Sequence, residues 1–361
     1  MKSGTGEFRG AVMGASSLLG KELLTVLEDR QFPFSQLLKI EANDAGEAEP
    51  EPPILDLSEQ AYPSISDEEA SRADLDFVFL AARPRQWPAV LGHADGSGPS
   101  RTVVIDLAGA AGAEPVAPAR DWLLSIPSLQ GDRLGDWVTG QPPLFRSAHP
   151  AVIVISSLLV RLAAHFPLES AVAQVYSPAS EIGPSAIEEL QKQTVDLLRF
   201  QKIPTATFGA QLAFNLLPRL GRARRGGSAP YRDALTDLEA RIRSELRQYL
   251  EGRVPLPAVR LVQAPVFYSL AFSLYVEMAE PAKPEAVGAA LAGDRIHVRR
   301  FSGQAPSPVE ATETSDILVD AVTSESANPA GLWIWAAADN LRLAAVNAVE
   351  IAESLRGRIR P

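Results

Sequence analysis

Residues 8–27 read FRGAVMGASSLLGKELLTVL, an apolar run followed by a turn with two glycines and a leucine-rich segment. The apolar run at 8–13 is typical of a short buried strand, and the leucines behind the turn recur at helical spacing. A strand that leads through a glycine-containing turn into a helix is the opening unit of a doubly wound α/β sheet. This stretch therefore decides the fold class of the N-terminal half.

Two further runs, DFVFLA at 76–81 and TVVIDL at 102–107, are almost entirely apolar. Such runs are typical of parallel strands that are covered on both faces. Strands that alternate with helices predict a doubly wound sheet up to about residue 147.

From residue 151 the pattern changes to longer helices. Helical periodicity predicts helices at 152–164 and 187–200. The second helix is amphipathic, and four of its polar residues are expected to face the solvent: Glu188, Glu189, Lys192 and Gln193. Strand-like segments interleave with these helices, at 172–177, 262–269 and 271–278. This mixture predicts an α+β second domain.

The composition limits the function classes. The 361 residues fit about two domains, and the net charge of −10 argues against nucleic-acid binding, because phosphate contacts need a positive face. The chain has no cysteine, which excludes disulfides and thiol catalysis, and its four histidines lack metal-ligand spacing. No apolar run reaches the ~20 residues that span a bilayer. Residues 1–10 lack the apolar core of a signal peptide, so we expect a cytoplasmic protein.

Two segments further along the chain are as distinctive as the N-terminal stretch. The first combines IEELQKQT at 187–194 with AFNLLP at 213–218, and the second is GLWIWAAADNLR at 331–342, which continues into AAVNAVEIA. In these segments and their order the chain resembles the aspartate-semialdehyde dehydrogenase family, oxidoreductases of amino-acid biosynthesis. The resemblance implies a Rossmann-type domain, to which the last helix returns, and an α+β dimerisation domain. We expect residues 1–147 and 331–361 in the first domain and 148–330 in the second.

The glycine turn is the candidate cofactor site. A helix that starts near Ser17 offers free N–H groups and a partial positive charge to a pyrophosphate. Ser17 takes the place of the family's middle glycine; its hydroxyl can donate to a phosphate, while its Cβ narrows the approach to the backbone. The expected cofactor-binding residues are Gly14, Ala15, Ser16, Ser17, Leu18 and Gly20. The pattern also fits a plain strand-to-helix connection, so the sequence leaves retention of the cofactor open.

Glu41 follows the predicted second strand and completes this candidate site. An acidic residue there hydrogen-bonds the ribose 2′-hydroxyl of NAD and repels the 2′-phosphate of NADP. The family usually carries an arginine two positions further, where this chain has Asn43 and then Asp44. If a dinucleotide binds, we therefore expect NAD to be preferred over NADP. Alternatively, Glu41 opens a solvated acidic stretch that ends at Glu51.

The resemblance also implies a reaction, in which a cysteine thiolate attacks an aldehyde with support from a glutamine and a histidine. Arginines and a lysine hold the anionic groups. The family's Asn-Pro-Asn-Cys motif falls on residues 149–152, HPAV, so the nucleophile position is Val152, which cannot form a covalent intermediate. The other positions hold Ser177 for the glutamine, Leu270 for the histidine, Gln263 and Gly112 for two arginines, and Pro184 for the lysine. We therefore expect no catalytic residue of the family kind, and an apolar pocket that disfavours a charged substrate.

Other residues could supply chemistry. Ser156 and Ser157 lie in a predicted helix, where we expect serines to bond back to the helix backbone. His149 is the histidine nearest to the presumed site, and it is either a proton donor or an inert loop residue without a partner. The basic cluster RLGRARR at 219–225 is either a contact for an acidic partner or a solvated loop.

Two hypotheses follow. In the first, the chain is a catalytically inactive relative of the family, a binding or regulatory homologue that forms a homodimer or pairs with an active dehydrogenase homologue. In the second, it is an NAD(P)-dependent oxidoreductase that acts on an aldehyde or oxo group by direct hydride transfer, without a covalent thioester intermediate. A two-fold dimer would find its apolar area on the 187–200 helix and on the segments at 265–267 and 272–276.

Overall fold

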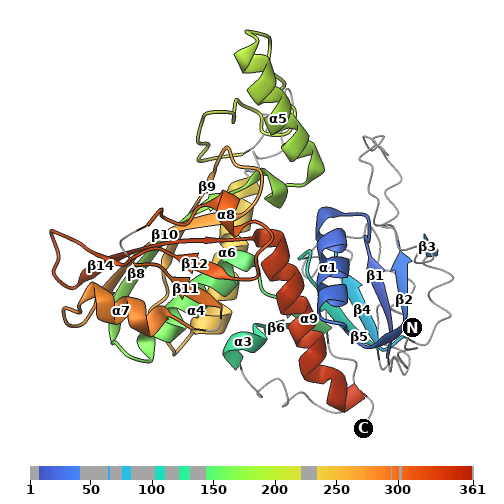
Figure 1. Ribbon diagram of the computed structural model, residues 1–361, viewed down its shortest axis with the longest axis horizontal. Coiled ribbons are helices and arrows are strands. Elements are labelled where there is room, and N and C mark those ends of the chain that lie inside the picture. Colours follow the sequence, from blue (N-terminus) through green and yellow to red (C-terminus); the bar gives the residue numbers. More distant parts are fainter. Residues whose placement is uncertain are drawn as a thin grey trace, which may run out of the picture. The chain divides into compact units, whose positions relative to one another are not determined.

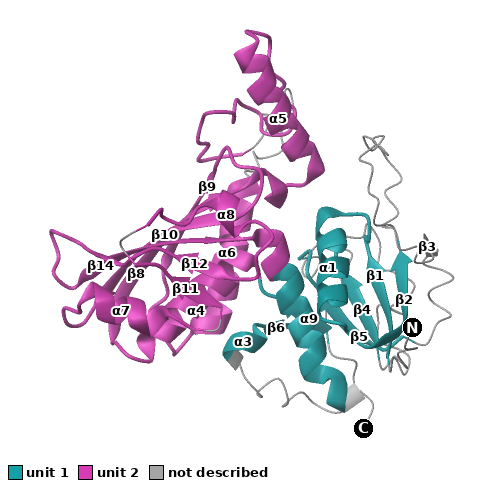
Figure 2. Ribbon diagram, viewed as in Figure 1, with its two compact units in different colours: residues 1–148, 344–361 teal, residues 149–343 magenta. Residues whose placement is uncertain are grey.

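The glycine turn at 14–20 joins the first strand of a parallel sheet to a helix packed on that sheet. The structure, a computed structural model, describes residues 8–40, 64–65, 75–82, 102–109, 122–130, 144–220, 234–293, 295–300 and 303–359. The chain divides into two units: unit 1 comprises residues 1–148 and 344–361, and unit 2 comprises residues 149–343 (Figure 2).

The described strands of unit 1 pair in parallel, in the order β3-β2-β1-β4-β5-β7-β6 (Figure 1). Their bounds are β1 Phe8–Met13, β2 Phe34–Ile40, β3 Ser64–Ile65, β4 Phe77–Leu80, β5 Val103–Asp106, β6 Leu123–Ser125 and β7 Leu144–Ser147. The chain leaves β1 for β2 and β3 on one side and returns to β4 on the other, so the strand order reverses between β1 and β4. Ligands of doubly wound sheets bind at the carboxyl ends of the strands at such a reversal. The predicted Rossmann-type fold is confirmed.

Both faces of this sheet are buried, which explains the apolar runs of its strands. Helices α1 (Leu18–Asp29) and α9 (Asn340–Ile359) pack on one face, against a core that includes Phe77 and Phe79. Val78, between these two, points into the core of the opposite face. Because successive side chains of β4 enter different cores, every residue of this strand is apolar.

Helix α9 is tied to the carboxyl ends of β6 and β7. Asn347 Nδ2 donates to the carbonyl oxygen of Ser125 and to the hydroxyl of Ser147, each at 2.9 Å. All three residues are buried, so the amide satisfies polar groups that water does not reach. The short helix α3 (Pro127–Gln130) follows β6.

The strands of unit 2 form a mixed sheet in the order β11-β12-β14-β10-β8-β9, with β13 paired to β14. Their bounds are β8 Leu168–Ser177, β9 Ala258–Gln263, β10 Leu270–Met278, β11 Ile296–Val298, β12 Ile317–Val319, β13 Thr323–Ser324 and β14 Gly331–Ala338. The predicted strand at 262–269 is wrong, because β9 ends at Gln263, shortly before Pro265, which has no N–H to donate to a ladder. The sheet and its helices confirm the α+β class.

The unit boundary near the C-terminus differs from the expected one. Strand β14, in the segment that the sequence assigns to the first domain, pairs antiparallel with β10 over its full length. The division therefore falls between residues 343 and 344, inside α9, and not before residue 331. The residues GLWIWAAA are apolar because β14 is an inner strand of the sheet of unit 2, between β12 and β10.

Three helices form one layer on the sheet of unit 2. Helix α4 (Pro150–Ala163) packs on β8, α6 (Ala234–Leu250) on β9 and α7 (Pro284–Leu291) on β11, and α4 contacts both other helices. The 3-10 helix η3 (Ala179–Glu181), helix α5 (Pro184–Leu198) and helix α8 (Pro308–Ala311) lie in the connections. Of the helices in the described ranges, none combines the length and apolar character that crossing a membrane requires.

Candidate functional site

The two glycines of the β1–α1 turn are required for backbone packing. Gly14 has a φ of +74°, and a Cβ at this position would lie 2.4 Å from the Cβ of Ala82. A Cβ at Gly20 would lie 2.1 Å from the carbonyl oxygen of Gly14. Protein atoms fill the space beside both glycines, so the glycines alone are no sign of a bound nucleotide.

Ser17 is the N-cap of α1 and closes the turn. Its Oγ accepts the N–H of Gly20 at 3.0 Å, and its hydroxyl donates to the carbonyl oxygen of Ala81 at 3.1 Å. Ala81 directly follows β4, so this hydroxyl connects the two strands between which the sheet reverses. Among the other expected cofactor residues, Ala15 is buried, Ser16 is exposed and Leu18 is half-buried.

The turn fits a dinucleotide in part. The N-terminus of α1 and the strand reversal form the frame that a pyrophosphate uses. The hydroxyl of Ser17, which the sequence offers as a donor to phosphate, is engaged within the protein both as donor and as acceptor. Glu41, Asn43, Asp44 and Gly112 lie outside the described residues.

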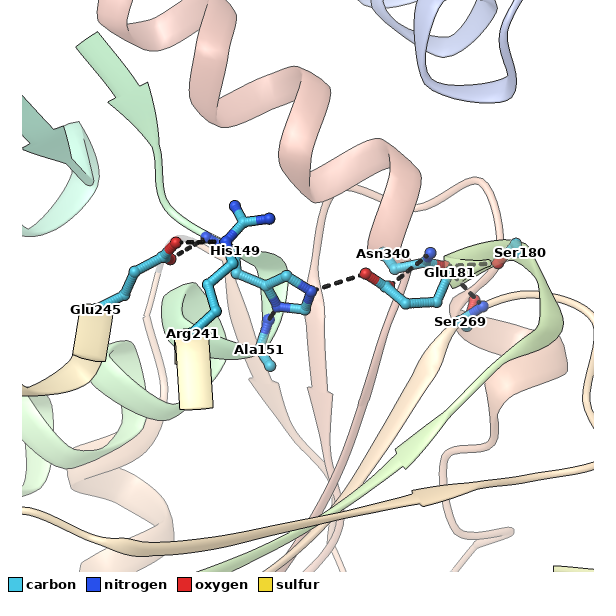
Figure 3. A network of polar contacts seen from close by, with 8 residues as sticks. All are labelled: His149, Ala151, Ser180, Glu181, Arg241, Glu245, Ser269 and Asn340. Carbon is cyan, nitrogen blue, oxygen red and sulfur yellow. Dashed lines mark hydrogen bonds and ion pairs between the residues drawn. The ribbon is translucent and has the colours of Figure 1, made fainter. Parts of the chain in front are cut away.

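In unit 2, residues 149–152 form the first turn of α4. His149 is the N-cap, and Pro150 follows it at the first helical position, where no N–H is needed. His149 Nδ1 accepts the N–H of Ala151 at 3.1 Å, and Nε2 lies 2.7 Å from Glu181 Oε1 (Figure 3). Because Nδ1 is an acceptor, the ring proton is on Nε2 and is donated to the Glu181 carboxylate. His149 therefore has partners on both ring nitrogens, and neither is open to a substrate.

Glu181 connects His149 to the start of α9. Asn340 Nδ2 donates to Glu181 Oε2 at 3.3 Å. Asn340 Oδ1 accepts the hydroxyl of Ser180 at 3.1 Å and the N–H of Ser269 at 3.2 Å (Figure 3). Ser269 has a φ of +70°, an uncommon conformation for a residue with a Cβ, and the bond to Asn340 helps to hold it. One amide thus joins η3, the residue that precedes β10 and the start of α9.

The negative charge of Glu181 is stabilised by its partners. Burial raises the pKa of the Glu181 carboxyl, but the ring of His149, the charge of Arg241 and the amide of Asn340 lower it more, and the net pKa lies below the ordinary value. Behind His149, Glu245 accepts its backbone N–H at 2.8 Å and pairs with Arg241, also at 2.8 Å.

The sequence pattern gives no sign that Glu181 has this role. Asn340 is easier to find, because Asp339 and Asn340 directly precede an apolar helix, a pattern typical of an N-cap. Asp339 fulfils that function, since its Oδ1 accepts the N–H groups of Leu341 and Arg342 at 2.8 and 2.9 Å.

Of the described positions that the resemblance assigns to thiol chemistry, all but the exposed Pro184 are buried. Val152 and Leu270 are buried apolar side chains. Gln263 Nε2 donates to the carbonyl oxygen of Ser177 at 2.9 Å. Gln263 Oε1 and Ser177 Oγ are buried and have no hydrogen-bond partner among the described residues. The hydroxyl of Ser177 therefore lacks the adjacent base that a serine nucleophile needs.

Ser156 and Ser157 are buried in α4. Within the described part of the chain, Ser156 Oγ has no hydrogen-bond partner, so the expectation that it bonds back to the helix backbone is wrong. Neither serine has the position of an activated nucleophile.

Helix α5 and the segment after it, residues 184–217, form what we call the α5 arm. Glu189 accepts the N–H groups of Thr207 and Phe208, at 2.6 and 3.1 Å. Gln193 binds four backbone groups of residues 204–213. The expectation that Glu189 and Gln193 face the solvent is wrong, because they are buried against this segment and satisfy its backbone.

The α5 arm exposes apolar side chains. Phe200 is 99% exposed and Phe214 is 69% exposed, and Leu198 and Leu216 are exposed as well. Both phenylalanines lie in the left-handed region, with φ of 55° and 60°, which is costly for a residue with a Cβ. The hydrogen bonds of Glu189 and Gln193 hold the segment that carries Phe214 and Leu216. Apolar side chains that a held segment exposes to water are typical of an interaction surface.

The sheet contributes less to such a surface than the sequence indicates. Phe272, Leu274 and Val276 are buried in the core of unit 2, which removes them from the expected interface. Side chains that alternate with them on β10 lie on the other face, where the ring of Tyr275 packs 5.2 Å from that of Trp333. Most of the basic cluster at 219–225 lies outside the described residues.

Comparison with known proteins places these features in a family context. The family description "Semialdehyde dehydrogenase, dimerisation domain" matches residues 159–343. The chain is 27% identical to an aspartate-semialdehyde dehydrogenase of Prochlorococcus marinus, over 96% of each chain. It is 28% identical to a USG-1 protein homolog of Pseudomonas aeruginosa, again over 96% of each.

A solved structure shows the same fold. The structure of a probable aspartate-semialdehyde dehydrogenase from Pseudomonas aeruginosa superimposes with a TM-score of 0.77 and 26% sequence identity, and covers 97% of this chain and 99% of that one. The likeness therefore extends over both units.

The lowered pKa of Glu181 predicts a dependence of stability on pH. A carboxyl whose pKa is lowered by folding stabilises the folded state at pH values above its ordinary pKa, and this contribution is lost as the pH falls through the lowered value. We expect urea unfolding to show that Glu181→Gln is less stable than the wild type near neutral pH, and that the difference shrinks in acid. The control is Glu188→Gln, which removes an exposed carboxylate of α5. If Glu181→Gln lowered the free energy of unfolding by the same amount at all pH values, the lowered pKa of Glu181 would be contradicted.

Proposed function

Because the chain belongs to the semialdehyde dehydrogenase family, we propose that it keeps the scaffold of an aspartate-semialdehyde dehydrogenase without its thiol chemistry. In this proposal it is a catalytically inactive homologue with a binding or regulatory role. The observation on which the proposal rests is the complete absence of cysteine from the 361 residues. Without a thiol, the covalent intermediate of the family reaction cannot form.

The residues around position 152 support this proposal. Val152 is enclosed in the first turn of α4, and the helix start is held by His149 through bonds to Ala151 and Glu181. A histidine with both nitrogens bonded inside the protein is a poor general base. The segment aligned with the nucleophile motif thus caps α4 and, through His149, links this helix to Glu181.

The alternative, direct hydride transfer to an oxo group, finds less support. Such a reaction needs a proton donor beside the reacting oxygen. In the described ranges, the side chains aligned with the family site are apolar or enclosed, including Leu270 and Ser177. The ring of His149 already donates its proton to Glu181.

For the cofactor, we propose weak residual binding of a dinucleotide at the β1–α1 turn, with NAD preferred over NADP. The strand reversal and the N-terminus of α1 support the binding, and the internal bonds of Ser17 limit it. The preference for NAD rests on the sequence alone, through Glu41 and Asp44.

We further propose that the chain forms a homodimer through unit 2, with the α5 arm at the interface. The match to a dimerisation domain spans the arm. The exposed Phe200 and Phe214 are anchors of the kind that interfaces bury, because an aromatic ring offers a large apolar area at low conformational cost. A pairing with an active dehydrogenase homologue would use the same surface.

The first prediction concerns activity. In an assay with aspartate semialdehyde, phosphate and NADP or NAD, we expect turnover at background level, at least about 10⁶-fold below an active dehydrogenase measured alongside, which is the size of loss that follows removal of a nucleophile. Val152→Cys alone should not restore turnover, because Leu270 and Gln263 replace the supporting residues. A melting curve of Val152→Cys serves as the folding control. Phosphate-dependent turnover by the wild-type chain would refute the proposal.

The second prediction concerns assembly. Sedimentation equilibrium at micromolar concentration should report a dimer for the wild type and a monomer for the double variant Phe200→Asp/Phe214→Asp. Charges on these exposed side chains cost little in the folded monomer, whereas they would have to be buried without a partner in the interface.

Val309→Asp is the matched control, since Val309 is 86% exposed on α8, outside the arm. It should leave the dimer intact. A monomeric wild type would contradict homodimerisation, and an unchanged dimer in the double variant would exclude the arm from the interface.

A further inference from the structure

Ser17 uses its polar groups inside the protein. Its backbone N–H donates to the carbonyl oxygen of Gly14 at 3.0 Å. Its Oγ accepts the N–H of Gly20, and its hydroxyl proton goes to the carbonyl oxygen of Ala81. Ser17 thereby connects three places: Gly14, directly after β1; Gly20, in the first turn of α1; and Ala81, directly after β4.

A phosphate at a helix N-terminus needs the free N–H groups of the first turn. In α1 the N–H of Gly20 already has the oxygen of Ser17 as its acceptor. The Cβ of Ser17 also stands where a glycine would leave the backbone open. A phosphate that takes the N–H of Gly20 must therefore first displace the hydroxyl of Ser17 from it, and any phosphate at this turn meets the Cβ of Ser17.

We infer that Ser17 is a latch that keeps the β1–α1 turn closed to a dinucleotide and sets the weakness of its binding. This inference rests on the proposed residual affinity of the same turn for NAD. The remaining parts of the turn do not need to change, because Gly14 and Gly20 preserve the close packing of β1, α1 and β4. Removing one side chain should open the site.

Calorimetric titration of the full chain with NAD tests the latch in four versions: the wild type, Ser17→Gly, Ser17→Ala and Ser307→Gly. Glycine is accepted at an N-cap, so α1 is expected to remain folded in Ser17→Gly. Ser17→Ala removes the hydroxyl and keeps the Cβ, which separates the two contributions. Ser307→Gly makes the same substitution at the N-cap of α8, outside the β1–α1 turn, and leaves both bonds of Ser17 in place.

We expect Ser17→Gly to bind NAD at least about tenfold more tightly than the wild type, a difference of about 1.4 kcal/mol. Ser17→Ala should lie between them, and Ser307→Gly should match the wild type. Equal, measurable affinity of the wild type and Ser17→Gly would overturn the latch and leave the proposed residual binding intact. A gain in Ser307→Gly as large as that in Ser17→Gly would also overturn it. If no version binds NAD, both the latch and the residual binding are refuted.

Discussion

The hydrogen bond from His149 to the Glu181 carboxylate joins segments of unit 2 that lie far apart in the sequence. With Asn340 as the second partner of Glu181, it connects the start of α4, η3 and the start of α9. A charge-assisted bond in a mostly buried site is stronger than an exposed one, and its loss would leave the carboxylate with Asn340 as its remaining donor among the described residues. Helix α4 belongs to the layer that covers the sheet, so the joint fixes one end of a helix in that layer.

The joint begins at His149, in the segment on which the sequence resemblance places the nucleophile motif of the family. A reactive site keeps polar groups available for a substrate, whereas a structural site bonds them to one another. His149 is bonded on both ring nitrogens, and Ser17 in unit 1 is bonded as donor and acceptor. Gln263 Oε1 and Ser177 Oγ are exceptions, but both are enclosed. In both units, the described polar groups at the positions that the resemblance assigns to the family site are bonded within the protein or enclosed by it.

The fold was predictable because hydrophobic periodicity reports burial directly: the FVFL run of β4 is apolar since both of its faces are covered. The boundary at β14 was not, because an apolar run does not say which sheet it joins. Glu189 and Gln193 also escaped prediction, since a polar residue on a helix looks solvent-facing until the loop backbone that it satisfies is known. The resemblance places Val152 at the family's nucleophile position. The sequence gives no indication that Glu181 and Asn340 are hydrogen-bonded to each other and, through Glu181, to His149 nearby.

A double-mutant cycle in equilibrium urea unfolding near neutral pH tests the central claim most directly, namely that this chain has a structural joint where the family has its reactive residues. The variants are His149→Asn, Glu181→Gln and the double variant. Asparagine is a good N-cap, so His149→Asn keeps the cap of α4 and removes the bond to Glu181. The account predicts that each single variant is destabilised and that the coupling free energy between the two positions lies at about 0.5–3 kcal/mol. A coupling free energy near zero would contradict it.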